Sequence, residues 1–433
     1  MAAATAVRVA PNEKTLALFI GGEPYIWSQS DEDSSLTLQA CLPRNTKAKD
    51  VQVDYSDDHV VVTILESNVR VQGKLYGSIN KHDLVWQLET TPKDGRRVLT
   101  VNMEKLVETR WPTLIVEPIN GNIDPHSLYL LAEGDLASAR ISTNQAESLQ
   151  FNIDALAKLT KAAEQDNIPA ILRLAAWYQF GAEASNAIPV KKDLEKGFEL
   201  HLKAAELGNC EACYIVGCSF ANISGDSIKV SYPDAIVWWT NCLNYDDHLA
   251  DHSRALYVSA AWQAGLLLLK GGDKLGDPAP EKALTYWKIS GSQGHPPSMY
   301  NIGLLLMNGW GTATTDVAAG VKLIASAVSI DPSKVLTLPP QLEGLTPVEL
   351  EKLIEMAREN KEELVHVLVD KVKAEQKAAE DKTLKKKKKR KSSKKVDQTG
   401  LSTTTIVVGV VGVVALTAAV GYLAYRYGER RTS

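Results

Sequence analysis

Apolar and polar residues alternate with a period of two over residues 15–105. The stretch SSLTLQACL places Leu36, Leu38, Ala40 and Leu42 on one side of an extended chain. Similar runs are TLALFI, VQVDY, HVVVTIL, VRVQGKL, LVWQL and RVLTVNM, and polar turns such as YSDD and PKDGR separate them. About seven short strands that each hide one face predict an all-β, seven-stranded antiparallel sandwich. We place it at residues 15–123, after a flexible N-terminus at 1–14.

The period changes after WPTLIVEPINGNIDP. Asp124 and Pro125 can cap and start a short helix, PHSLYLLA, inside a linker at 124–150. From residue 151 onward, segments rich in Ala and Leu repeat with a mean step of about 43 residues, which predicts an all-α helix-pair solenoid over 151–335. Small residues that allow close helix approach recur in register, and tryptophans fill the spaces between helices. These small residues are Ala175, Gly217, Gly265 and Gly303, and the tryptophans are Trp177, Trp239, Trp262 and Trp287.

One long amphipathic helix is expected at 345–381, where Thr346 and Glu349 form a capping box. Its apolar stripe favours a cap on the last repeat over a coiled coil between chains. Residues 382–403 are too basic to pack and are expected to form a flexible polybasic linker.

The residues from Ile406 to Ala424 are nineteen in a row without a charge, enough to cross a hydrocarbon core. We therefore expect a single transmembrane helix at 404–425, followed by a short basic tail at 426–433. With so few residues after the span and no leader-like segment at the start, this pattern is typical of a tail-anchored protein whose body lies in the cytosol. The Val-rich span and basic tail favour the mitochondrial outer membrane over the endoplasmic reticulum or the peroxisome.

Charge is distributed unevenly along the chain. The net charge is −4 overall, but about +11 from residue 382 onward, which leaves about −15 on the rest. An acidic body argues against nucleic acid as its partner. The lysine run beside the span is expected either to contact anionic lipid head groups or to act as a solvated spacer, with a nuclear import signal as a third alternative. The residues concerned are Lys385, Lys386, Lys387, Lys388, Lys389, Arg390 and Lys391.

No catalytic, metal or cofactor motif stands out. The five cysteines lack a framework spacing and are expected to be reduced. The pair Cys210 and Cys213 suggests a zinc or redox site, but a structural role is favoured because nothing nearby completes four ligands. His248 and His252 could share a helix face, yet no third ligand accompanies them. We predict no enzyme activity, no cofactor and no small-molecule substrate.

The first part of the chain resembles the CS domain of the NudC and small acidic co-chaperone families. The resemblance begins at YIWSQ and continues through LP, KDV, GKL, LVWQLE and MEKLVETRWPTLI, about 100 residues in register. Trp-Pro stands where NudC proteins usually carry Trp-Trp, which leaves the subfamily open. The positions carried over are Tyr25, Trp27, Gln29, Trp86 and Trp111, for which a role in the sandwich core is favoured over direct contact with a partner. Residues 155–330 resemble SEL-like helical repeats, given their KAAELGN and Gly-Trp-Gly elements.

These resemblances imply binding rather than catalysis. CS domains recruit the ninety-kilodalton heat-shock chaperone or its clients, and SEL-like repeats act as adaptor scaffolds. We therefore expect a membrane-tethered co-chaperone or adaptor, with a structural tether or organiser that self-associates or binds another membrane protein as the alternative.

Overall fold

The computed structural model describes most of residues 25–342, together with positions 348 and 352. Gaps fall at 31, 33, 43–44, 65–67, 91–96, 182–189, 224–229, 245–250, 273–274, 313, 332, 334–335 and 340–341. The strand expected at TLALFI, the long helix at 345–381 apart from those two positions, the polybasic linker, the span at 404–425 and both tails lie outside the described residues. Within the described part of the chain, no helix is long and apolar enough to cross a membrane.

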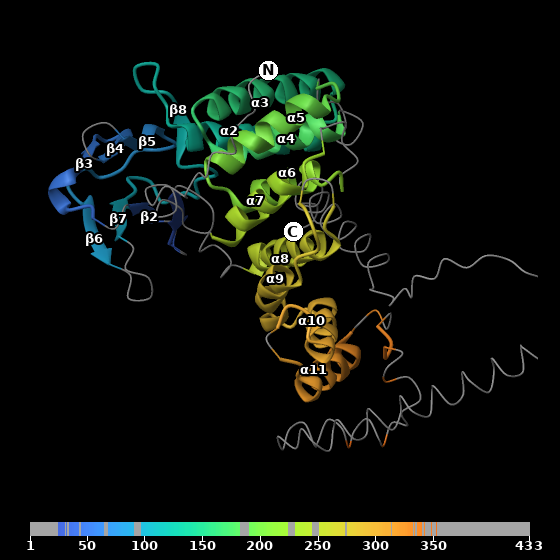
Figure 1. Ribbon diagram of the computed structural model, residues 1–433. Coiled ribbons are helices and arrows are strands. Elements are labelled where there is room, and N and C mark those ends of the chain that lie inside the picture. The colour runs from blue at the N-terminus through green and yellow to red at the C-terminus, as the bar shows by residue number, and fades with distance from the viewer. Residues whose placement is uncertain are drawn as a thin grey trace, which may run out of the picture. The chain divides into compact units, whose positions relative to one another are not determined.

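The N-terminal part is a sandwich of two four-stranded antiparallel sheets (Figure 1). One sheet has the strand order β1-β2-β7-β6 and the other β3-β4-β5-β8. The strands are β1 (Tyr25–Gln29), β2 (Ser35–Leu42), β3 (Val51–Tyr55), β4 (His59–Ile64), β5 (Asn68–Leu75), β6 (Val85–Thr90), β7 (Arg97–Glu104) and β8 (Ile115–Glu117), with a short 3-10 helix η1 (Ala48–Asp50) before β3. Six of the seven predicted strands lie in the described residues and form β2 to β7. The other two described strands, β1 and β8, were not predicted, because they are too short or too polar to show a period.

The core of the sandwich comes from the alternation itself. Leu36, Leu38 and Ala40 of β2 are buried in turn, while the residues between them are partly exposed. Val60 and Val62 of β4 supply the facing layer. Each strand therefore contributes one apolar face to a single shared core.

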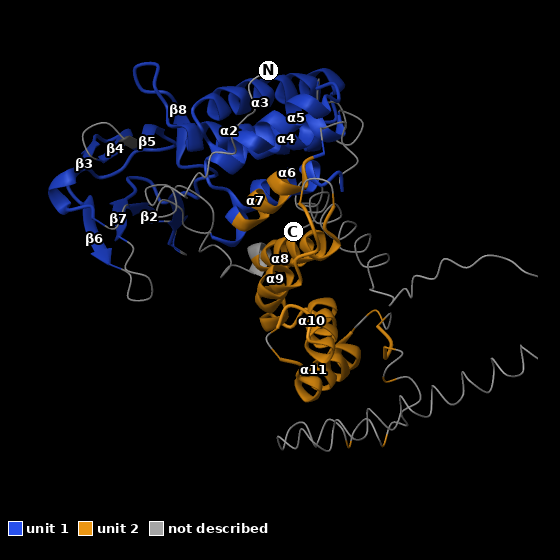
Figure 2. Cartoon of the chain, viewed as in Figure 1, with its two compact units in different colours: residues 1–230, 241–253, 422–433 blue, residues 231–240, 254–421 orange. Residues whose placement is uncertain are grey.

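The rest of the described chain is helical (Figure 1). The helix α2 (Pro125–Ile141) packs on α3 (Gln145–Glu164), so the short helix predicted in a linker is in fact seventeen residues long and begins the helical region. The remaining helices are α4 (Ile168–Phe180), α5 (Leu194–Glu206), α6 (Cys210–Phe220), α7 (Tyr232–Leu243), α8 (Asp251–Lys270), α9 (Pro280–Ser292), α10 (Pro296–Asn308) and α11 (Val317–Ile330). Figure 2 divides the chain into two compact units, one of residues 1–230, 241–253 and 422–433, the other of 231–240 and 254–421.

Similar sequences, such as KAAEQDN and KAAELGN, recur at the helix junctions, and the backbone conformation there explains them. Asp166, Gly208 and Gly294 all have positive φ, at 61°, 93° and 80°, in the turn that ends one helix and leads to the next. Asn167 and Asn209 then cap α4 and α6 by accepting a hydrogen bond from a backbone N–H of the first turn. Each of these sequences therefore ends one helix at a residue of positive φ and begins the next helix with an N-cap residue.

The small residues predicted to let helices approach do so within the second unit. A Cβ built on Gly265 would lie 2.2 Å from the indole Nε1 of Trp287, and one on Gly303 would lie 2.6 Å from a side-chain carbon of Ile324. Trp287 stacks on Trp262, with ring centroids 5.7 Å apart, and donates to its backbone carbonyl at 3.2 Å. Larger residues at the two glycines would push neighbouring helices apart.

Inside the first unit, the sandwich and α2 are joined through a buried polar cluster. The carboxylate of Asp124 caps α2 by accepting from the backbone N–H of Ser127 at 2.8 Å, and it also accepts from the backbone N–H of Gln72 on β5 at 2.9 Å. The backbone N–H of Asp124 donates to the carbonyl of Gln72 at 3.1 Å. The hydroxyl groups of Tyr25 and Ser127 are hydrogen-bonded at 2.7 Å. The Asp124 carboxylate thus forms hydrogen bonds with both α2 and β5.

Candidate protein-binding surfaces

Three of the five motif positions carried over from the CS resemblance hold the sandwich together. Tyr25 is buried and bonds to Ser127, as described above. The side-chain amide of Gln29 forms two hydrogen bonds with the backbone of Trp111. It accepts from the N–H at 2.8 Å and donates to the carbonyl at 2.7 Å. Lys105 also donates to Gln29, at 2.7 Å. Gln29 therefore fixes the buried Trp111 from a strand eighty-two residues away.

The other two motif positions flank the core of one sheet. Trp27 pairs with Leu38, Leu38 with Val101, and Val101 with Trp86, so all four lie in one row across β1-β2-β7-β6. Directly paired residues share a face of the sheet, and Leu38 and Val101 face the core. Both tryptophans are half-buried at the two edges of that row. This position suits packing and leaves each only partly open to a partner.

An apolar surface lies beside Trp111, at the end of the sandwich where β5 and β7 finish. Tyr76, Leu106 and Val107 are 48%, 58% and 65% exposed, and we call them the loop patch. The ring of Tyr76 lies 6.0 Å from that of Trp111, and the Leu106 N–H donates to the Ser78 carbonyl at 2.9 Å. The two loops are thus fixed to each other, and their apolar side chains remain outside. A fixed, exposed apolar cluster is typical of a protein-binding site.

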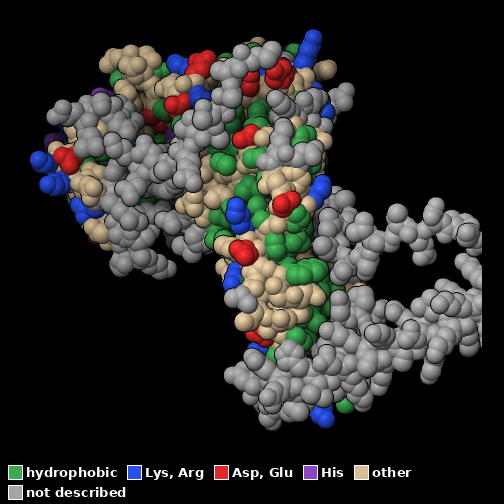
Figure 3. Space-filling model, in the orientation of Figure 1, with side chains coloured by type: hydrophobic (Ala, Val, Ile, Leu, Met, Phe, Trp, Pro, Cys, Tyr) green, Lys and Arg blue, Asp and Glu red, His purple; other side chains and the backbone are tan. Residues whose placement is uncertain are grey.

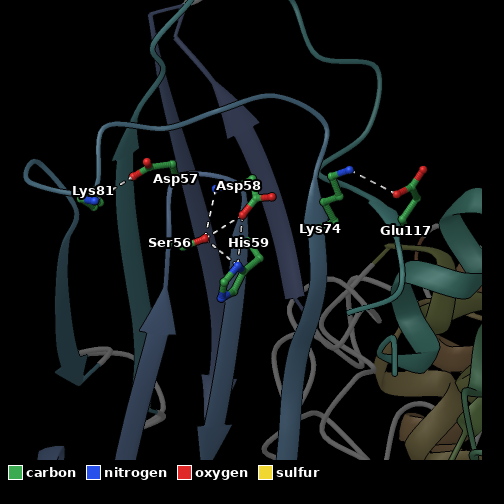
Figure 4. A network of polar contacts seen from close by, with 7 residues as sticks. All are labelled: Ser56, Asp57, Asp58, His59, Lys74, Lys81 and Glu117. Atoms are coloured by element: carbon green, nitrogen blue, oxygen red, sulfur yellow. Dashed lines mark hydrogen bonds and ion pairs between the residues drawn. The ribbon is translucent and has the colours of Figure 1, made fainter. Parts of the chain in front are cut away.

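A charged turn between β3 and β4 borders the same end of the sandwich (Figure 4). Ser56 Oγ lies 2.5 Å from His59 Nδ1 and 2.8 Å from Asp58 Oδ1. His59 Nδ1 also lies 3.2 Å from Asp58 Oδ1, and the hydrogen bonds of Asp58 with Ser56 first and then with His59 lower the pKa of its carboxyl group. The three residue types are those of a hydrolase triad, but the serine and the aspartate both contact the same imidazole nitrogen. A triad needs them on opposite nitrogens, so this arrangement cannot relay a proton from the serine to the aspartate.

The turn is instead a structural element with charges around it. Its backbone carbonyls at Asp57 and Asp58 accept from the N–H groups of Ile79 and Leu75, both at 2.8 Å. Around it lie the exposed ion pairs Lys81–Asp57, at 3.6 Å, and Lys74–Glu117, at 3.3 Å (Figure 4). Such exposed pairs add little stability and leave a polar rim beside the loop patch.

The second unit contains a hollow lined mainly by apolar side chains, which we call the solenoid pocket. It is small, with a free volume of about 10 Å³, which is about the space of one water molecule. Asn301, which is 3% exposed, has no hydrogen-bond partner for its Nδ2 among the described residues, and Trp310 at the rim is 43% exposed. The exposed lining of the hollow is entirely apolar, so the buried amide nitrogen of Asn301 is not open to it. The lining residues are Leu269, Trp287, Asn301, Leu304, Leu305, Asn308 and Trp310.

The cysteine spacing seen in the sequence does not make a site. All five cysteines are buried and reduced. Cys210 lies against Cys242, with the sulfurs 2.6 Å apart, and not against Cys213, whose thiol points to the Ala205 carbonyl at 3.7 Å. Burial, together with the Cys210 thiol, raises the pKa of the Cys242 thiol well above its usual value. No group of three or more His, Cys, Asp or Glu in the described residues is placed to hold a metal ion.

Several predicted positions lie where the structure says nothing of them. His248 and the side chain of His252 are outside the described residues, as are Lys385 to Lys391. The loop patch and the solenoid pocket, in turn, were not singled out from the sequence. Their signals are present in the run MEKLVETRWP and in the Gly-Trp-Gly element, which also carry the family resemblance.

Comparison with known proteins agrees with this division of the chain. The family model of the CS domain matches residues 23–105, and that of the Sel1 repeat matches 168–209, 258–295 and 296–329. The matched repeats leave out residues 210–257, which hold α6 and α7. The nuclear movement protein nudC of Dictyostelium discoideum is 30% identical over 94 residues, which are 22% of this chain and 51% of that protein. The chain therefore aligns with about half the length of this relative.

Two solved structures are similar to larger parts of the chain. A Sel1 repeat protein from Oxalobacter formigenes is 16% identical, with a TM-score of 0.35, over 54% of this chain and 85% of its own. A protective antigen from uropathogenic Escherichia coli is also 16% identical, with a TM-score of 0.25, over 64% of this chain and 58% of its own. At these scores neither carries an argument about function. The family matches and the fold together show that this chain contains a NudC-like CS domain followed by Sel1 repeats, both of them protein-interaction modules.

Proposed function

We propose that this protein acts by binding and not by catalysis, as a membrane-tethered co-chaperone or adaptor. The observation that carries the proposal is the presence of two interaction modules in one chain, each with its own fixed apolar surface. The loop patch belongs to the CS domain and the solenoid pocket to the Sel1 repeats. The Asp124 cluster ties the CS domain to the first helices, so a partner on the sandwich is held in a defined place on the chain.

The ninety-kilodalton heat-shock chaperone, or a client of it, is the partner proposed for the loop patch. Exposed aromatic and aliphatic side chains ringed by charges suit a folded protein surface, because the rim excludes water from the central contact. The solenoid pocket, with the exposed Trp310 at its rim, is proposed to contact a second protein through apolar side chains. Bringing two partners to one chain raises their effective concentration for each other without any new contact between them.

Binding measurements on the full chain in detergent micelles test this proposal. Val107→Asp places a charge in the loop patch, and we expect it to weaken binding to the purified chaperone by roughly tenfold or more. Val230→Asp is the matched control, because it makes the same change at an exposed valine outside the sandwich. Equal affinities of the two variants, or no measurable binding by the unaltered protein, would exclude the chaperone as the partner of this patch.

Tethering rests on the uncharged run at 404–425 and the lysines before it. We propose that this segment anchors the protein in the mitochondrial outer membrane, with Lys385 to Lys391 near anionic head groups. Imaging a reporter fused to residues 380–433 tests the address. A signal on mitochondria is expected, a reticular pattern would refute the choice of organelle, and a diffuse signal would refute tethering altogether.

A structural organiser that self-associates is the second candidate, and one observation favours it. Ile141, at the end of α2, and Leu149 and Ile153, on α3, are all exposed, and the last two lie one turn apart. They form an apolar face on the α2–α3 hairpin that a second copy could cover. Sedimentation of the full chain in micelles distinguishes the candidates. A monomer argues for the adaptor, whereas a dimer that Leu149→Asp dissociates argues for the organiser.

A further inference from the structure

One charged side chain in the sandwich has no partner. The Nε and Nη2 atoms of Arg70, on β5, are buried and make no hydrogen bond within the described residues. Burial lowers the pKa of Arg70 to about 10, and Cys41 on the facing sheet opposes this shift. A guanidinium group taken out of water without a counter-charge is strongly unfavourable, so it calls for an explanation.

A β-bulge places Arg70 there. Val62 of β4 pairs with Val71, and Thr63 pairs with Val69, so Arg70 is the extra residue between two pairs. A bulge changes the direction of a side chain and is frequent beside functional sites. Two guanidinium nitrogens of Arg70 are buried, and the neighbouring Val71 is fully buried in the core, so the guanidinium lies toward the space between the sheets. Without the bulge, residue 70 would alternate with Val71 and point away from that space.

The loop between β2 and η1, at the same end of the sandwich as Arg70, supplies a second unpartnered group and several positive charges. Thr46, in the loop after β2, is 4% exposed, and its hydroxyl makes no hydrogen bond within the described residues. Arg97 donates to the Thr46 carbonyl at 3.2 Å and so ties this loop to the start of β7. Lys47 and Lys49 follow in the chain and are exposed. We call Thr46, Lys47, Lys49, Arg70 and Arg97 the basic end of the sandwich.

Among the described residues, few acids lie near these charges in the sequence. Asp50 is the nearest in sequence, and its carboxylate already accepts from the backbone N–H of Lys47 at 2.8 Å. Glu89, near the end of β6, is exposed. Lys and Arg side chains are visible at the outer edge of the sandwich in Figure 3. The basic end is thus a local exception to a body that is acidic as a whole.

We propose that Arg70 anchors a binding site for a carboxylate group, supplied by an Asp or Glu side chain of an acidic peptide segment in a partner protein. The Nε–H and one Nη2–H of a guanidinium point in parallel along one edge, and a carboxylate accepts both through its two oxygens. These are the two atoms left without partners. Lys47 and Lys49, exposed at the same end of the sandwich, attract the acidic residues that flank the bound carboxylate.

A carboxylate fits this site better than a phosphate. It carries a single charge, so its pair with Arg70 is neutral and can be buried between the sheets, whereas a phosphate brings close to two charges. The inference deepens the proposed function by naming the chemistry that the CS domain recognises. It concerns the end of the sandwich away from the loop patch, so either proposal can fail while the other stands.

The test is side-chain NMR on the full chain labelled with ¹⁵N-arginine, in detergent micelles. The Nε–H signal of Arg70 is assigned by its loss in Arg70→Lys. We expect a Glu-containing peptide with an amidated C-terminus to shift this signal downfield, and the same peptide with Gln in place of Glu to leave it unchanged. The readout excludes the lysines at 382–403, which would attract any acidic peptide but carry no such signal.

Thermal unfolding supplies the control for folding and charge. The Glu peptide should raise the melting temperature of the unaltered protein and of Arg140→Gln, which removes an exposed arginine at the end of α2, but not of Arg70→Gln. Arg70→Met should melt above the unaltered protein without peptide, since it removes a buried charge that has no partner.

Four results would overturn the proposal. They are an unshifted Arg70 signal, an equal shift by the Gln peptide, a lower melting temperature for Arg70→Met, and tighter binding of inorganic phosphate than of the Glu peptide. Acetate alone acting as strongly as the peptide would show a site for free anions and would also exclude a peptide ligand.

Discussion

Replacing Asp124 by Ala should loosen the attachment of the CS domain to the helices. The substitution removes the cap of α2, and it leaves the N–H of Gln72 on β5 buried without an acceptor. A cap alone contributes about 1 kcal/mol, and a hydrogen bond to a charged acceptor about 1.5–3 kcal/mol. Burial raises the pKa of this carboxyl group, which shows that its desolvation offsets part of the gain. We therefore expect a loss of about 3 kcal/mol in the free energy of local opening.

Hydrogen exchange on the full chain measures this loss directly. Since 1.4 kcal/mol corresponds to a factor of ten, the N–H groups of Gln72 and Ser127 should exchange about 100-fold faster in Asp124→Ala. The matched control is Asp193→Ala, which removes the exposed cap of α5, where the carboxylate accepts only from Lys196 at 3.0 Å. It should cost about 1 kcal/mol and leave Gln72 unchanged. If the two variants lower the free energy of local opening by the same amount, each at its own helix, then the hydrogen bond from Asp124 to β5 adds no stability and the reasoning is wrong.

Three further predictions concern stability. Gly303→Ala should destabilise by about 2 kcal/mol in denaturant unfolding, because its Cβ would meet Ile324, whereas Gly134→Ala, which meets nothing within 4 Å, should stabilise by up to about 1 kcal/mol. Arg173→Ala should lower the free energy of unfolding by about 3–5 kcal/mol, because the side chain donates twice to Glu133 at 2.7 Å in a partly buried pair. A smaller loss would show that the Glu133 carboxylate is well solvated. Burial lowers the pKa of His126 to about 4. The stability that depends on a neutral ring is therefore fully present above pH 6.5, and up to about 3 kcal/mol of the free energy of unfolding should be lost as the pH falls to 4. His126→Phe should flatten this pH profile of the melting temperature, and an unchanged profile would assign it to other groups.

Much of the fold could be predicted from local patterns. The strands β2, β3, β4 and β7 follow the alternation because one face of each is buried. The close helix contacts at Gly265 and Gly303 could be predicted, because a contact with no room for a side chain requires a small residue at the same position of each repeat.

The features that matter for binding depend on residues far apart in the chain. The sequence showed that Asp124 can cap a helix, but its second partner, Gln72, lies fifty-two residues earlier. The pattern Cys210-x-x-Cys213 drew attention to the wrong neighbour, because Cys210 meets Cys242 once α6 and α7 have formed. Arg70 stood in the regular run VRVQGKL, and only a shift in strand pairing turns it inward. Register and packing of this kind have no signal within a short window of sequence.

The central claim is that one chain binds proteins through two separate surfaces. Quantitative capture from cytosolic extract tests it most directly, with the full chain, Val107→Asp and Trp310→Ala as baits and Trp310→Phe as the conservative control. We expect Val107→Asp to lose one set of partners and Trp310→Ala to lose another, while Trp310→Phe retains both sets. If both variants capture the same proteins as the unaltered chain, neither surface binds a partner and the account is wrong.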